Sequence, residues 1–252
     1  MRYLKFILTA ALFLMGCTLS VQAKRVKKND HAYVDLGLPS GTLWATCNVG
    51  ASKPEEYGDY FAWGETKPKK KYTLSNCIYV TIKEEGGFNY VTKYNMSGYY
   101  GGTIDSLLVL LPEDDVATAN WGNGWRMPTK DEIVELKKNT YAVWSDGYNG
   151  TDVRGVIFYK AKSADDKGEF VGSWPPPPYY SVASDSHVFL PAAGYRWADE
   201  LNAVAKSGYY WSSSLHEDYE EIAHILYFHD REVALGDDGR YMGFPVRAVR
   251  AK

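Results

Sequence analysis

Short runs of alternating hydrophobic and polar residues recur along most of the chain, and this period of two predicts β-strands separated by turns. Within residues 223–228 the alternation places Leu226 and Phe228 on one face of a strand, and Ile225, Tyr227 and His229 on the other. Further strands are predicted within residues 33–45, 57–64, 153–159, 188–196, 208–214 and 243–249. The pattern therefore predicts a strand-rich fold.

Two other segments qualify this picture. The predicted strand at 188–196 contains Ala192, Ala193 and Gly194, small residues that indicate a close approach of another part of the backbone. Residues 75–102 follow no regular period, and we expect long loops with short strands there.

The clearest helix signal lies in residues 121–136. Thr129 and Glu132 have the spacing of a capping box, in which each side chain satisfies a backbone N–H of the first helical turn. Ile133 and Leu136 then repeat at helical spacing. This stretch predicts a turn followed by a capped helix.

A second, shorter helix is predicted to begin within residues 110–117, where Pro112 suits the first helical position. Glu113, Asp114 and Asp115 either complement the positive end of the helix dipole or form a calcium site. Three consecutive carboxylates cannot all point at one ion without other ligands, which favours the role at the helix end.

The composition indicates one globular domain, which we place at residues 31–250. The 252 residues include 21 Tyr, 8 Trp and 23 Gly, and this aromatic content suits a Trp-rich core or an aromatic binding surface. The formal net charge of -3 is near neutral, and the charges follow no pattern along the chain. Neither gives an indication of nucleic-acid binding.

The first residues have the pattern of an export signal. A basic start at residues 1–5 precedes an apolar run at 6–19 that is too short for a stable membrane span. Cleavage after Ala23 releases a soluble chain with a polar linker at 24–30. The alternative is a lipobox, with cleavage after residue 16 and a lipid on Cys17 as the membrane anchor. Both alternatives predict a periplasmic, outer-membrane or extracellular protein.

Two cysteines remain in the mature chain. In an oxidising compartment Cys47 and Cys77 either form a disulfide or stay as buried free thiols. Their spacing matches no zinc motif, and we expect neither a metal nor a cofactor.

Six blocks of the chain together resemble one known family, the Fibrobacter succinogenes major paralogous domain of secreted and envelope proteins in Bacteroides-like bacteria. The resemblance implies an α+β domain with a C-type-lectin-like fold of the formylglycine-generating-enzyme branch. Such a fold has short twisted antiparallel strands, a few helices and long loops. The blocks are residues 34–45, 57–65, 125–129, 189–196, 210–214 and 243–249.

Two activities found on similar folds lack their residues in this chain. Formylglycine-generating enzymes oxidise with a late pair of cysteines, and no cysteine follows Cys77. Calcium-dependent lectins use a Glu-Pro-Asn or Gln-Pro-Asp loop followed by Trp-Asn-Asp, and neither motif occurs. We therefore expect a protein that is not an enzyme.

The segment 216–241 is the strongest candidate for a site, because it holds three of the five histidines. Their spacing does not place two imidazoles on one strand face or helix turn, which disfavours a metal, and no nucleophile motif lies nearby. The segment resembles the variable region of C-type-lectin-like proteins diversified by retroelements. We predict exposed ligand-binding residues at His216, Asp218, Tyr219, Tyr227, His229, Arg231, Asp237, Asp238, Arg240 and Tyr241.

The resulting hypothesis is an exported binding domain for a protein or glycan ligand on a cell surface. Three alternatives stay open: an ordinary polar hairpin without diversification, a structural subunit of an envelope appendage, and an enzyme of unknown reaction.

Overall fold

The computed structural model describes residues 31–82, 89–99, 101–122, 124–172 and 178–252. The predicted leader, Cys17 and the linker at 24–30 lie outside these residues. No helix in the described part of the chain is both long and apolar enough to cross a membrane.

The described chain is rich in strands, with two α-helices, and the predicted α+β class with short strands is confirmed at this level. The helices are α1 (Val116–Trp121) and α2 (Lys130–Asn139), with short 3-10 turns at Leu74–Asn76 and Tyr148–Gly150. The strands are β1 (Tyr33–Asp35), β2 (Leu43–Asn48), β3 (Val80–Ile82), β4 (Asn89–Val91), β5 (Thr140–Ser145), β6 (Gly155–Lys160), β7 (Phe170–Val171), β8 (His187–Pro191), β9 (Tyr195–Trp197), β10 (Glu200–Asn202), β11 (Ser207–Leu215), β12 (Ile222–His229), β13 (Glu232–Gly239) and β14 (Arg247–Arg250).

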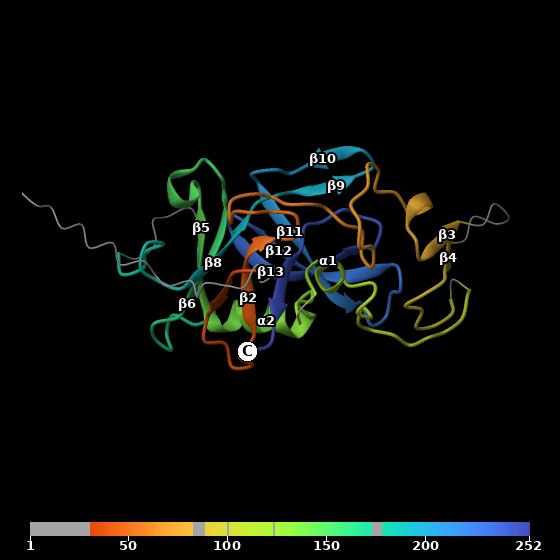
Figure 1. Ribbon diagram of the computed structural model, residues 1–252, viewed down its shortest axis with the longest axis horizontal. Helices are drawn as coiled ribbons and strands as arrows, with labels where there is room; N and C mark the ends of the chain where they lie inside the picture. Colours follow the sequence, from red (N-terminus) through yellow and green to blue (C-terminus); the bar gives the residue numbers. More distant parts are fainter. Residues whose placement is uncertain (1–30, 83–88, 100, 123, 173–177) are drawn as a thin grey trace, which may run out of the picture.

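These strands form small sheets in which antiparallel pairing prevails. The orders are β7-β5-β6-β8, β11-β12-β13, β1-β2-β14, β3-β4 and β10-β9, and among these described strands the parallel pair is β5 and β7. The four-stranded sheet and the β3-β4 hairpin lie at opposite ends of the molecule, with β11-β12-β13 between them and α2 along the lower side (Figure 1). The first and last strands flank β2 in one sheet.

The sheet β11-β12-β13 separates two hydrophobic cores, which explains the alternation predicted for β12. Ala223 and Ile225 face the first core, whereas Leu226 and Phe228 face the second. Both faces are covered, so β12 is more buried than a strand at the surface. The first core contains the indole rings of Trp63, Trp125 and Trp211, and the second is built around Trp44, Leu136 and Phe158.

Helix α2 begins with the predicted capping box. The Glu132 N–H donates to Thr129 Oγ1 at 3.2 Å, and the Thr129 N–H donates to Glu132 Oε2 at 2.9 Å. The Arg126 guanidinium also donates to both oxygens of Glu132, each at 2.6 Å. Burial would raise the pKa of Glu132, but the hydrogen bonds from Arg126 and Thr129 outweigh it and hold the pKa below its ordinary value.

We expect Glu132→Gln to lower the free energy of unfolding at pH 7 by roughly 1–3 kcal/mol, the range for hydrogen bonds to charged groups. Because the folded pKa is depressed, the charged carboxylate stabilises the protein above its ordinary pKa of 4.5 and loses this effect as pH falls through the folded value. The deficit of the variant should therefore shrink towards pH 3, as measured by urea unfolding. Glu169→Gln is the control, because Glu169 is exposed. A deficit independent of pH would contradict the role of the charge.

The three acidic residues before α1 point to different partners. Asp115 caps the helix by accepting the Thr118 N–H at 2.9 Å, as predicted for a helix end. Asp114 instead accepts hydrogen bonds from Tyr79, Tyr94 and Lys93. Within the described residues, no group of three or more His, Cys, Asp or Glu side chains is arranged to hold a metal ion.

The alternative of a disulfide is wrong, because Cys47 and Cys77 are both free thiols. Cys47 lies within β2, in the sheet with β14, and is half-buried. Cys77 is buried at the end of the 3-10 turn that precedes β3. Cys47 thus lies in a strand, whereas Cys77 lies in a turn outside that sheet.

Candidate functional site

The sheet β11-β12-β13 carries nearly all the residues predicted to bind a ligand, but it separates them into two groups. The loop between β11 and β12 holds His216, Asp218 and Tyr219, and the exposed Asp237 pairs with His224 near that end. At the opposite end, Arg231 forms the turn after His229. The eight residues of β12 place the two ends roughly 25 Å apart. One small ligand cannot contact both groups.

The loop at the first end is held by short-range contacts. The backbone N–H of Asp218 donates to Nδ1 of His216 at 3.1 Å, and the His216 ring lies between Tyr219 and His224, with centroids 5.0 and 5.2 Å away. Glu220 is buried below and accepts the Ser97 N–H at 2.8 Å. The loop is therefore anchored, while Tyr219 and Asp218 remain exposed.

A strip of exposed hydrophobic side chains adjoins this loop. Residues 108–110 run beside the end of β11, where the Leu215 N–H donates to the Leu108 carbonyl at 2.9 Å and Val109 bridges to Ser214. Ten large hydrophobic side chains are exposed in the described part of the chain, and half of them belong to the loop or to the stretch that leads to this contact. They are Tyr99, Ile104, Leu108, Val109 and Tyr219. With His216 and Asp218, these residues form what we call the loop face.

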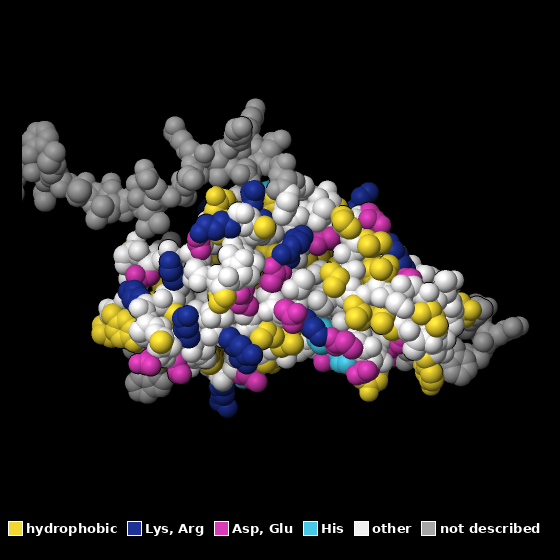
Figure 2. Space-filling view, turned by 90° about the horizontal axis from the view of Figure 1, so that it is seen from below, with side chains coloured by type: hydrophobic (Ala, Val, Ile, Leu, Met, Phe, Trp, Pro, Cys, Tyr) yellow, Lys and Arg dark blue, Asp and Glu magenta, His cyan; other side chains and the backbone are white. Residues whose placement is uncertain are grey.

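Ionisable groups border the loop face on the side of α2. Glu217 pairs with Lys130 and lies 3.1 Å from Nε2 of His224. Burial and the nearby Lys130 lower the pKa of His224, which favours the neutral imidazole. On the face of the molecule that carries α2, histidines lie among acidic side chains, next to hydrophobic ones (Figure 2).

Two of the predicted ligand residues towards the second end of β12, Tyr227 and His229, belong to a row of aromatic rings that crosses β9, β11 and β12. Tyr195, Tyr209, Tyr227 and His229 follow one another with centroid separations of 5.1, 5.0 and 5.6 Å. All four rings are half-buried. Burial and the neighbouring tyrosines raise the pKa of Tyr209 to about 12, so its hydroxyl stays protonated at neutral pH.

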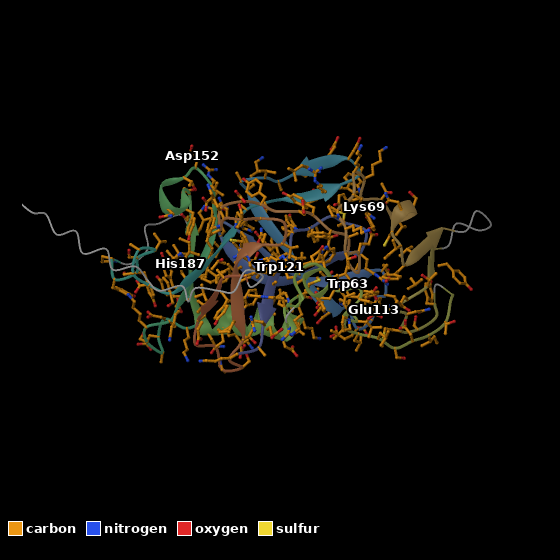
Figure 3. All side chains as sticks on the ribbon, in the orientation of Figure 1. Trp63, Lys69, Glu113, Trp121, Asp152 and His187 are labelled. Atoms are coloured by element: carbon orange, nitrogen blue, oxygen red, sulfur yellow. The ribbon has the colours of Figure 1, made fainter. Side chains whose placement is uncertain are left out.

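Arg240 is not at the surface, and its predicted exposure is wrong. Its side chain is 1% exposed, and the guanidinium lies over the rings of Trp63, Tyr94 and Tyr79, at 4.9, 5.6 and 5.9 Å from their centroids. Trp63, one of the rings that enclose Arg240, lies in the same half of the molecule as Glu113 and away from His187 (Figure 3). A position enclosed in this way cannot vary freely or contact a ligand. Asp238 and Tyr241 are half-buried beside it in the chain.

The serines of β11 hold the backbone, as predicted for strand residues. The hydroxyl of Ser212 donates to the His224 carbonyl at 2.7 Å, and that of Ser213 donates to the Pro128 carbonyl at 3.3 Å. Both are buried and neither contacts an imidazole ring in these bonds. The hydroxyl groups of Ser212 and Ser213 are therefore engaged with the backbone, and these bonds do not activate either of them as a nucleophile.

Sequence reasoning missed the residues that border the predicted segment in space. Ile104, Leu108 and Val109 lie between the irregular stretch 75–102 and the predicted start of a helix, where no element is predicted. The pairing of Leu108 and Val109 with β11 brings this part of the chain to the loop. Tyr195 and Tyr209 were predicted only as strand residues. The sequence does not show that Tyr195 and Tyr209 lie side by side, because that requires the contact between distant segments at Gly194 and Gly208.

Comparison of the chain with family models, with curated proteins and with solved structures found no match. The family resemblance of the six blocks therefore stays a prediction.

Proposed function

We propose that this chain is an exported binding domain, without enzymatic activity, that recognises a protein ligand through the loop face. The observation that supports it is the gathering of half of the exposed large hydrophobic side chains around the predicted loop 216–219. Soluble proteins rarely expose contiguous apolar patches, and those that do use them as interaction sites.

A protein ligand fits this surface better than a glycan. Ile104, Leu108 and Val109 offer aliphatic groups, which gain free energy when they meet other apolar side chains. Sugar hydroxyls provide no such partners. Tyr219 adds a large amphipathic ring of the kind that contributes most at protein interfaces.

The loop face is also supported from below, which lowers the entropy lost on binding. Glu220 joins the loop to Ser97, and Arg240 donates to the Glu220 carbonyl at 3.0 Å. Segments far apart in the sequence are thus fixed to each other before a ligand arrives. The proposed export rests on the leader pattern at the start of the sequence.

The test is selection of binders to the purified chain from a displayed library of random peptides, followed by affinity measurements. We expect Tyr219→Ala combined with Val109→Ala to weaken the selected peptides at least tenfold, about 1.4 kcal/mol. Trp197→Ala is the matched control, since Trp197 and Tyr219 are each 54% exposed but lie in different hairpins. Peptides that bind the double variant as well as the original chain, or that lose affinity only with Trp197→Ala, would refute the site.

A further inference from the structure

We infer that the partner of the loop face is a cationic protein segment, with an apolar centre and lysine or arginine side chains around it. This inference rests on the proposed function, because it concerns the ligand of the same surface. It follows from how charges are distributed around the loop face and from which of them are already paired.

Acidic side chains surround the loop face from four separate elements. Asp131 lies in α2, Glu217 and Asp218 in the loop, Asp237 in β13 and Glu113 before α1, and all five are exposed. Asp131 and Asp237 lie near enough to His224 to act on its charge, and Glu217 lies 3.1 Å from its Nε2. These three carboxylates therefore border the loop on the side of α2 and β13. A distribution of this kind suits the rim of an interface rather than a single ion.

The basic side chains at this end are engaged with acids of the protein. Lys93 contacts Asp114 and lies 3.6 Å from Glu113, and Lys130 pairs with Glu217. Five exposed acids against these two lysines leave an excess of three negative charges.

The interior below does not reverse this field. Arg240 is a buried cation that donates to the carbonyl of Glu220, which is itself a buried acid. Asp114 is another buried acid and is bonded to Tyr79 and Tyr94, whose rings lie beside Arg240. These buried groups together carry one further negative charge. Such a potential accelerates encounter with a cationic partner and disfavours acidic ones, including a second copy presenting the same face.

The experiment uses two synthetic peptides with the same leucine and tryptophan anchors, one flanked by lysines and the other by glutamates. Affinities for the purified chain are measured at about 0.05 M and about 0.5 M salt, which shortens the screening length of the solution about threefold. We expect the lysine peptide to bind at least tenfold more tightly at low salt, and this preference to fall several-fold at high salt.

Two pairs of substitutions locate the effect. Asp218→Asn with Asp237→Asn should reduce the preference for the lysine peptide several-fold. Asp199→Asn with Glu200→Gln, which removes the same charge from the exposed end of the β9-β10 hairpin, should leave it unchanged. An equal effect of both pairs would mean attraction by net charge alone and would overturn the inference.

The results also separate this inference from the proposed function. If both peptides bind equally and both still require Tyr219, the cationic partner is wrong and the binding face stands. If neither depends on Tyr219, both proposals fail. If sedimentation shows a dimer of the chain that Tyr219→Ala dissociates, the occupant is a second copy and the inference is overturned.

Discussion

Replacing Arg240 by methionine is expected to lower the free energy of unfolding by about 3–5 kcal/mol, because several buried backbone carbonyls then lose their donor. The Arg240 guanidinium donates to the carbonyl oxygens of Glu220, Lys93 and Tyr94 at 3.0, 3.1 and 3.4 Å. Methionine fills a similar volume without replacing these bonds. The loss is therefore one of hydrogen bonding and of contact between a cation and aromatic rings.

The size of the effect follows from what Arg240 connects. It follows directly on β13, yet its partners lie around residues 93–94 and in the β11–β12 loop. Removing it loosens residues 93–94 and the β11–β12 loop, and with them the neighbouring chain that carries the aliphatic part of the loop face. Amide hydrogen exchange should therefore accelerate in residues 93–99 and 101–110 more than in the four-stranded sheet.

Urea unfolding followed by circular dichroism measures the change in stability, with Arg231→Met as control. Arg231 is an exposed arginine at the β12–β13 turn, so the same substitution should change stability by no more than about 0.5 kcal/mol. Similar losses in the two variants would show that the buried guanidinium does not hold the two segments together.

The parts of this fold that the sequence predicts are those set by neighbours in the chain. The capping box of Thr129 and Glu132 requires only residues three apart, and the structure forms it. The alternation within β12 is likewise local, and the structure places Leu226 and Phe228 on the face opposite Ile225, as predicted. That each face meets a core of its own was not predicted. Both signals report a period or a spacing that any sheet or helix imposes.

The parts that could not be predicted depend on contacts between distant segments. An arginine is usually exposed, and Arg240 is buried because residues almost 150 positions earlier supply carbonyls and aromatic rings. The loop face has the same origin, since Leu108 and Val109 are brought to it by their pairing with Leu215 and Ser214 of β11. No local pattern at 97–109 marks these residues as exposed neighbours of the loop. The residue types of segment 216–241 are enough to predict it as a ligand-binding segment. The division of these residues between the two ends of β12 depends on how β12 pairs with β11 and β13.

Gly194→Ala is the other substitution expected to have a large effect, roughly 3 kcal/mol, because it combines a backbone penalty with a steric one. Gly194 has φ +63°, and a Cβ atom there would lie 1.9 Å from the Asn202 carbonyl oxygen and 2.8 Å from the Val204 nitrogen. Both obstacles are backbone atoms, so rotation of a side chain cannot relieve them. This is the close approach predicted from the small residues at 192–194.

Gly150→Ala separates the two penalties. Gly150 has φ +78°, but nothing lies within 4 Å of a Cβ built there, so its substitution costs only about 1 kcal/mol of backbone strain. The difference between the two variants in urea unfolding then measures the cost of the close approach itself. Because Tyr195 follows Gly194 and begins the aromatic row, the near-ultraviolet circular dichroism should change in Gly194→Ala and not in Gly150→Ala. Equal losses in both variants would mean that the positive φ alone requires glycine at residue 194, and that the contact with Asn202 adjusts without cost.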